Sequence, residues 1–286
     1  MNITASMVNE LRNKTGAGMM DCKKALMESG GDEEKAIDIL RKKGAAVALK
    51  RADKTANEGI VLAKVAADNT SAVMVEVNCE TDFVAKSEDF KKFAEYAVEK
   101  AFAVKAESPE DLMKKVPELE GELSAVAGKV GERTIISRLK TVEVKNGCVI
   151  DYIHYGSRLG VLISYDNVAA DKVSAFTTLG RNIAIQVAAM TPAVVYREEV
   201  DPAVVAHEME IYKDMARQEK KPENLLEKIA QGRLNKYFQE VCLYEQSYFS
   251  ENSKQIKDLI DDFNKENGTA VKINSFVRYN LSDPKN

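Results

Sequence analysis

The sequence predicts an α+β protein in which an all-helical head precedes two regions of antiparallel sheet and helix. Apolar residues in the first 52 positions recur at helical spacing between glycine-rich turns. Apolar runs of β character, typical of strands, begin only at Gly59. A long helical pattern between residues 201 and 244 then interrupts the second sheet region. This order of elements is why we predict a head, two mixed regions and an inserted helical hairpin.

Residues 1–52 are expected to form three short helices of the ubiquitin-associated type. The first helix begins after Thr4, a plausible N-cap, and ends at Gly16. The second runs from about Met19 to Gly30-Gly31. Asp32 caps the third, and Gly44 is expected to end it. These glycines lack the spacing of a phosphate-binding loop, so helix termination explains them better.

A linker at residues 53–58 leads to the first mixed region, residues 59–140, and we expect few core contacts to cross it. Residues 59–65 and 72–77 read as a hairpin, in which Val73, Val75 and Val77 indicate a half-buried strand. Ser87 is an N-cap for a helix to about Lys105. A second helical segment from Ser108 is broken at Pro117, and residues 133–144 return to strand character.

The second mixed region, residues 141–286, opens on Asn146-Gly147, the strongest hairpin signal in the chain. Strands at 149–153 and 159–165, a helix at 170–190, a helix at 253–266 and a closing strand at 269–281 follow. Two helices at 202–219 and 222–244 must be antiparallel, because only Lys220-Lys221 separates them. We expect this coiled-coil hairpin to protrude as an arm, with a seam made of Val204, Val205, Met209, Tyr212, Met215, Leu225, Leu226, Ile229 and Leu234.

Composition excludes several functional classes. Four well-separated cysteines and two histidines argue against a disulfide scaffold, a zinc site or any other metal centre, and we expect no cofactor. No apolar run is long enough to span a membrane and the N-terminus lacks a signal-peptide block, so a cytoplasmic protein is expected. The net charge of −4 argues against direct nucleic-acid binding. The head alone is basic, which suits RNA or an acidic protein surface equally well.

The segment Asn78-Cys-Glu-Thr-Asp-Phe-Val-Ala-Lys86 follows the alternating strand and carries the candidate site. Asp82 and Phe83, an acid beside a large aromatic at the end of a rigid strand, are well placed to wedge into a partner. They are poorly equipped for catalysis, because no histidine, cysteine pair or second carboxylate accompanies them. The alternative from these residues alone is that Phe83 covers the core and Asp82 caps the following turn.

This segment closely resembles the signature of the bacterial elongation factor Ts family, the nucleotide exchange factors of elongation factor Tu. Three further blocks resemble the same family in the same order, namely residues 3–26, Tyr152-Ile-His-Tyr-Gly-Ser-Arg-Leu-Gly-Val-Leu162 and residues 221–236. The resemblance implies a translation elongation factor that is not an enzyme and that promotes GDP release by displacement. It implies binding to elongation factor Tu with GDP or without nucleotide, and it leaves a homodimer or a 2:2 complex open.

Site residues follow from the resemblance position by position. Thr81, Asp82, Phe83 and Val84 match the segment that enters the partner beside the magnesium of the nucleotide. Arg12, Met19, Met20, Lys23 and His154 match positions that contact the partner. One of the two methionines is expected to face the core of the head. Tyr155 and Ser157 depart from the family pattern, in which small residues or glycine are frequent. Some members add a C-terminal helix, and we expect none after the closing strand here.

Two other functions fit parts of the sequence. A ubiquitin-associated-like adaptor would bind helical peptides through residues 1–52 without exchange activity. A hydrolase would use His154 with a nearby acid, but no nucleophile elbow or metal cluster supports it. Accelerated release of labelled GDP from elongation factor Tu separates the exchange factor from both.

Overall fold

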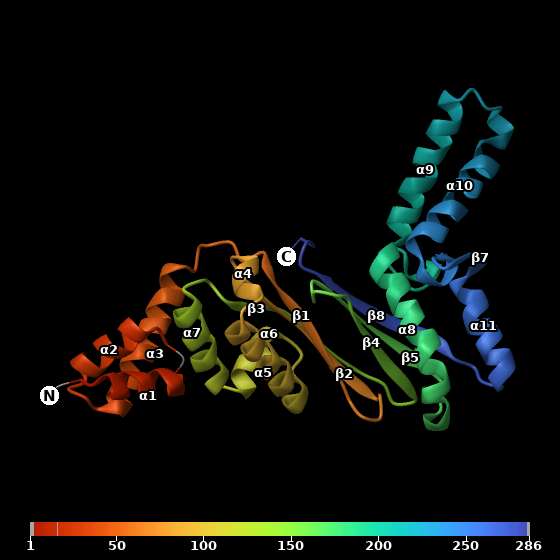
Figure 1. The fold of residues 1–286 in the computed structure, drawn as a ribbon. Coiled ribbons are helices and arrows are strands. Elements are labelled where there is room, and N and C mark those ends of the chain that lie inside the picture. The colour runs from red at the N-terminus through yellow and green to blue at the C-terminus, as the bar shows by residue number, and fades with distance from the viewer. Residues whose placement is uncertain (1–2, 16, 285–286) are drawn as a thin grey trace.

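Three helices form the N-terminal end of the molecule in the computed structural model, which describes residues 3–15 and 17–284 (Figure 1). They are α1 (Ala5–Thr15), α2 (Met19–Glu28) and α3 (Glu33–Lys50). Leu11, Cys22, Leu26 and Ala36 form their small core. Asp32 accepts a hydrogen bond from the backbone N–H of Lys35, as an N-cap should. Gly16, expected to end the first helix, lies outside the described residues.

The expectation that Gly44 ends the third helix is wrong, because α3 continues through it to Lys50. A Cβ atom at Gly44 would lie 2.4 Å from the carbonyl oxygen of Ser124 in α7 (Glu118–Val130). Gly44 therefore permits close packing of two helices, rather than a helix end. This packing also corrects the expectation that few contacts join the head (residues 1–52) to the rest of the chain.

The first sheet consists of β1 (Glu58–Val65), β2 (Ser71–Cys79) and β3 (Ile135–Glu143), all antiparallel in the order β1-β2-β3. Four helices lie between β2 and β3 in the chain: α4 (Asp82–Ala85), α5 (Glu88–Val104), α6 (Pro109–Lys115) and α7. Val73, Val75 and Val77 pack against Phe90 and Phe93 of α5. The side chain of Ser87 caps α5 as predicted, and the side chain of Ser108 caps α6.

The second sheet consists of β4 (Gly147–Ile153), β5 (Leu159–Asp166) and β8 (Lys272–Asn280), again antiparallel, in the order β4-β5-β8. One face of it packs on α8 (Val173–Met190), which follows a 3-10 turn at Ala170–Lys172, and on α11 (Ile256–Asn267). A two-stranded hairpin, β6 (Ser247–Tyr248) and β7 (Glu251–Gln255), was not predicted.

Asn146-Gly147 does not join two strands of one hairpin, in contrast to the prediction. β3 pairs with β2 and β4 pairs with β5, so this connection carries the chain from the first sheet to the second. A Cβ atom at Gly147 would lie 1.8 Å from the carbonyl oxygen of Tyr165. The glycine is therefore needed where β4 approaches β5, and the Asn-Gly pattern misleads here.

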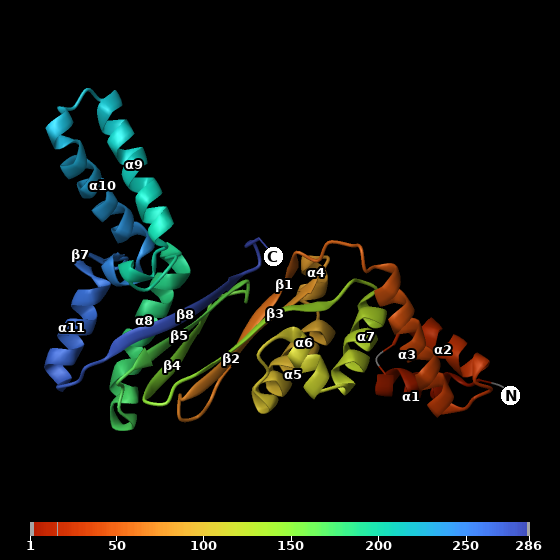
Figure 2. The ribbon, with the colours of Figure 1, turned by 180° about the vertical axis from the view of Figure 1, so that it is seen from behind.

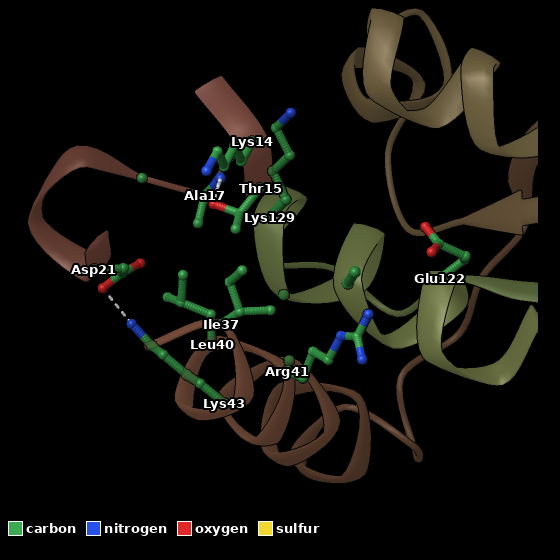
Figure 3. Close-up of a pocket in the computed structure, with 14 residues that line it drawn as sticks. Lys14, Thr15, Ala17, Asp21, Ile37, Leu40, Arg41, Lys43, Glu122 and Lys129 are labelled. Atoms are coloured by element: carbon green, nitrogen blue, oxygen red, sulfur yellow. Dashed lines mark hydrogen bonds and ion pairs between the residues drawn. The ribbon is translucent and has the colours of Figure 1, made fainter. Parts of the chain in front are cut away.

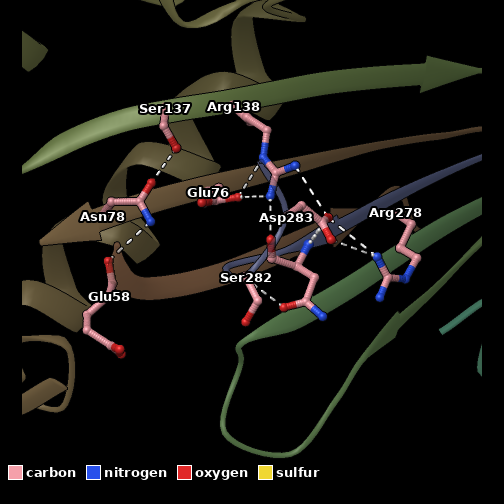
Figure 4. A network of polar contacts seen from close by, with 9 residues as sticks. Glu58, Glu76, Asn78, Ser137, Arg138, Arg278, Ser282 and Asp283 are labelled. Atoms are coloured by element: carbon pink, nitrogen blue, oxygen red, sulfur yellow. Dashed lines mark hydrogen bonds and ion pairs between the residues drawn. The ribbon is translucent and has the colours of Figure 1, made fainter. Parts of the chain in front are cut away.

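The two sheets stack face to face, with Val61 and Met74 of the first against Val149 and Leu162 of the second. β2 is consequently buried on both faces, and the prediction of a half-buried strand is wrong. Glu76 is 0% exposed and accepts a hydrogen bond from Arg138 Nε at 2.7 Å. Arg138 also donates to the backbone oxygen of Asn280 at 2.9 Å, which ties the last strand to the first sheet (Figure 4).

Helices α9 (Pro202–Gln218) and α10 (Leu226–Val241) form an antiparallel pair that projects from the second sheet (Figure 2). Their contact surface differs from the predicted seam, because Val204, Met215 and Leu225 are exposed. Ala216 and Ala230 are buried, and small side chains let two helices approach closely. The other residues of the predicted seam are buried or half-buried, as is Phe238, namely Val205, Met209, Tyr212, Leu226, Ile229 and Leu234.

Candidate functional site

The segment Thr81–Val84 is called the wedge below. It consists of the N-cap residue and the first three residues of the one-turn helix α4, which follows β2 closely in the chain. The Thr81 hydroxyl caps this turn by accepting a hydrogen bond from the backbone N–H of Val84 at 3.4 Å. At the other end, the Ser87 hydroxyl donates to the carbonyl oxygen of Val84 at 2.7 Å. Val84 and Ala85 face the core, so the turn is anchored on one side and presents the other to solvent.

Phe83 projects from this turn with 82% of its surface exposed. The alternative that Phe83 covers the core is therefore wrong. Asp82 lies beside it and accepts a hydrogen bond from the Lys86 ammonium at 2.6 Å, one turn along the chain. This hydrogen bond holds the pKa of Asp82 below its usual value, so the wedge carries a carboxylate at neutral pH.

Glu132 fixes the base of the wedge, although nothing in the sequence marked it. Its carboxylate accepts hydrogen bonds from the backbone N–H of Thr81 at 2.9 Å and of Glu80 at 3.1 Å, and from the Thr81 hydroxyl at 2.6 Å. The buried Cys79 thiol donates to the carbonyl oxygen of Thr81 at 3.2 Å, and burial raises the pKa of this thiol to about 12. An ionised acceptor with three donors holds this backbone more firmly than a neutral one would.

The loop between β4 and β5 lies beside the wedge. Asp82 and Lys86 line a surface cavity of about 520 Å3 together with Tyr155, Gly156 and Arg158. Arg158 forms an ion pair with Glu58, which raises the pKa of the guanidinium. The carbonyl oxygen of Ser157 accepts a hydrogen bond from the backbone N–H of Val61 at 2.7 Å. The loop is thus fastened to β1, and segments about 70 residues apart in the chain form one surface.

His154 follows the last residue of β4 and is exposed. Its Nδ1 lies 2.7 Å from the Tyr152 hydroxyl, so the ring is held by its neighbour in the strand. Tyr155, the next residue, is 97% exposed and stands free of the core. The structure therefore places His154 at the root of the loop whose tip lines the cavity beside Asp82.

The head residues singled out in the sequence are all at the surface. Arg12 on α1 and Lys23 on α2 are exposed. Met19 and Met20 are 52% and 62% exposed, so the expectation that one of them faces the core is wrong. Their burial would require rotation of α2, whose inner face is already filled by Cys22, Ala25 and Leu26. Met27, which no pattern in the sequence singled out, is also exposed and lies two turns after Met20 on the same helical face.

Metal-binding clusters, disulfides and membrane-spanning helices are all absent from residues 3–15 and 17–284. Across residues 3–15 and 17–284, no group of three or more His, Cys, Asp or Glu side chains is arranged to hold a metal ion. The four cysteines are unpaired and buried. In the same described part of the chain, no helix is long and apolar enough to cross a membrane.

Comparison with known proteins gives a consistent result. Residues 80–283 match the family model described as Elongation factor TS. The chain is 43% identical to the elongation factor Ts of Prosthecochloris aestuarii and 45% identical to that of Chlorobaculum parvum, with 98% of each chain covered. It is 45% identical to the elongation factor Ts of Clostridioides difficile, over 99% of this chain and 93% of the relative.

Proposed function

The chain belongs to the elongation factor Ts family and is thus a translation elongation factor, and we propose that it is the nucleotide exchange factor of elongation factor Tu. It would bind that partner with GDP or without nucleotide, in the cytoplasm, and release GDP without a covalent step. The observation that carries this proposal is Phe83, a large apolar side chain exposed on a turn that Glu132 holds rigidly.

The physical logic lies in the magnesium of the partner's nucleotide site. Mg2+ requires near-ideal octahedral geometry and keeps several waters, so a small displacement of the surrounding protein weakens nucleotide binding. We propose that the Phe83 ring displaces elements that hold those waters, while Asp82 competes for the same polar partners. Because coupling between two ligands is reciprocal, returning nucleotide would weaken the factor's own binding and allow it to leave.

Two further surfaces complete the proposed interface. The head would dock as a ubiquitin-associated-type bundle through Arg12, Met19, Met20 and Lys23, since methionine adapts to irregular surfaces and arginine is frequent in binding hot spots. His154 would meet a second domain of the partner. We also propose that residues 59–140 and 141–286 act as two subdomains joined by a linker at 53–58 to the head, with the helical pair inserted in the second.

The decisive experiment measures release of fluorescently labelled GDP from purified elongation factor Tu as a function of the concentration of this protein. We expect a large acceleration with the native chain and a rate close to spontaneous release with an equimolar control protein. Tight binding without acceleration would instead support the adaptor, which binds through the head whatever the nucleotide state of its partner.

A further inference from the structure

Helices α3 and α7 cross where both carry glycine. A Cβ atom added at Gly44 would lie 2.4 Å from the carbonyl oxygen of Ser124, and one added at Gly128 would lie 2.6 Å from the Cα of Gly44. Both distances are far below van der Waals contact, so the two backbones touch where side chains would normally separate them. α3 belongs to the head, and α7 packs against α5 in the core of the first sheet region. The crossing therefore fixes the head on the core through backbone contact.

Both helices lead from this crossing to the base of the wedge. Arg51, the residue after α3, forms an ion pair with Glu80 at 2.8 Å. Glu132, two residues after the end of α7, holds Thr81 through its backbone N–H and hydroxyl. Glu80 also accepts a hydrogen bond from the backbone N–H of Arg133 at 2.7 Å. The two residues before Asp82 are thus held from the ends of both crossing helices.

A cavity of about 260 Å3 lies beside the crossing, and charged residues of both the head and α7 line it (Figure 3). Lys43, from the head, pairs with Asp21, also in the head. Lys129, from α7, pairs with Asp89 of the core. Each of these two ion pairs joins residues of the same part, either the head or the core. The head and the core are joined at this junction by the steric contact at the glycines and by the Arg51–Glu80 ion pair.

We propose that the head and the wedge form one rigid docking unit, in which Gly44, Gly128, Arg51 and Glu132 are positioning residues. They hold the exposed face of α2 at a fixed place relative to Phe83. This inference rests on the proposed function, because its consequence is that both surfaces reach one partner together. Two rigidly linked contacts bind more tightly than two flexibly linked ones, since less conformational freedom is lost on binding.

The test replaces Gly128 by alanine and uses Gly121→Ala as a matched control, because Gly121 lies on the same helix with nothing within 4 Å of an added Cβ. Spin labels at Glu28→Cys in the head and Glu88→Cys in α5 report the distance between the two parts by pulsed electron resonance. Both sites are exposed, and the four native cysteines are buried away from the label.

We expect a narrow distance distribution in the otherwise native protein and in Gly121→Ala, and a shifted or broadened one in Gly128→Ala. In the exchange assay, Gly128→Ala should raise the KM for the partner by about tenfold while the maximal rate stays within about twofold. A purely structural role would lower the amount of active protein and leave KM unchanged.

Arg51→Gln provides a second variant that does not disturb helix packing, since the Arg51 side chain is 39% exposed. It should raise KM by about threefold, and it decides the matter if Gly128→Ala does not fold. Distances and KM values equal to the native ones in every folded variant would overturn the inference. Because the distances are measured without partner, they test the rigid unit even if the native protein fails to release GDP, which would refute only the proposed function.

Discussion

The two three-stranded sheets are built on the same plan but connect strand to helix in different ways. In each, two strands form a hairpin, helices follow, and a third strand returns to pair with the second. The connection after the second strand is tied to the segment before the third in both cases. Glu132 binds Thr81 in the first sheet region, and Asn167 donates to the carbonyl oxygen of Ala270 at 3.1 Å in the second.

The difference lies in where each connection places its largest apolar residue. Val168 is buried in the core of the second sheet, whereas Phe83 is exposed on the wedge of the first. Burying a phenylalanine side chain stabilises a protein by about 1.5–3 kcal/mol, so the first connection forgoes a gain that the second realises. The common plan shows that exposure is not required by the fold, which favours a binding role for Phe83.

The sharpest test of this comparison replaces Phe83 and Val168 by alanine in two separate variants. Phe83→Ala should reduce stimulated GDP release at least tenfold, because loss of an interface anchor costs about 2 kcal/mol or more. Its melting temperature should equal that of the native protein. Val168→Ala should lower the free energy of unfolding by about 2 kcal/mol, with normal exchange per folded molecule. The reverse pattern would show that Phe83 is the structural residue.

The next largest effect is expected at the residues that tie each connection down. Glu132→Ala removes the acceptor of three donors and should slow exchange by about fivefold to tenfold, with a loss of about 1–3 kcal/mol in stability. Asn167 has a positive φ of 61°, so Asn167→Gly is the matched change that removes the side chain without backbone strain. It should leave the exchange rate unchanged. Equal effects of the two variants on exchange would contradict the special role of the first connection.

A smaller effect is expected from Asp82→Ala, because the polar groups that Asp82 would meet in the proposed partner can bind water instead. We predict a loss of about twofold to fivefold in exchange. The folded pKa of Asp82 is lowered, so whatever its ion pair with Lys86 contributes is present above the unfolded pKa and disappears as pH falls through the folded value. The ratio of native to Asp82→Ala rates should therefore be constant from about pH 6 to 8. A ratio that changes across that range would contradict this assignment.

The arm should matter least for exchange, because it extends the second sheet region and not the one that carries Phe83. Leu226 is 3% exposed in its contact with α9, and Leu226→Asp places a charge in that apolar surface. We expect circular dichroism to show loss of the helices α9 and α10 alone, with exchange within about twofold of native. Cooperative loss of the whole fold would show that the pair is part of the core.

Local patterns were enough to predict many elements of this protein. Alternation at Val73–Val77 predicted β2, the Ser87 hydroxyl predicted the start of α5, and the short connection at Lys220-Lys221 predicted an antiparallel pair. These features depend on residues a few positions apart, whose spacing is the same in the chain and in the fold. The family signature likewise identified the segment that carries Phe83.

Only the tertiary structure decided which surfaces face one another. In the sequence, Gly44 resembles a helix end, and only the position of α7 shows that it permits helix packing. Likewise, Asn146-Gly147 resembles a hairpin turn, and only the pairing of β3 with β2 shows that it is not one. The contact surface between α9 and α10 depends on the buried Ala216 and Ala230, whose small side chains did not mark them as seam residues in the sequence. Glu132 lies 51 positions from Thr81, so no local pattern could join them. The sequence by itself determined most of the secondary structure and the family. Packing decided how firmly the wedge is held, because close packing and long-range hydrogen bonds exist only once distant segments meet.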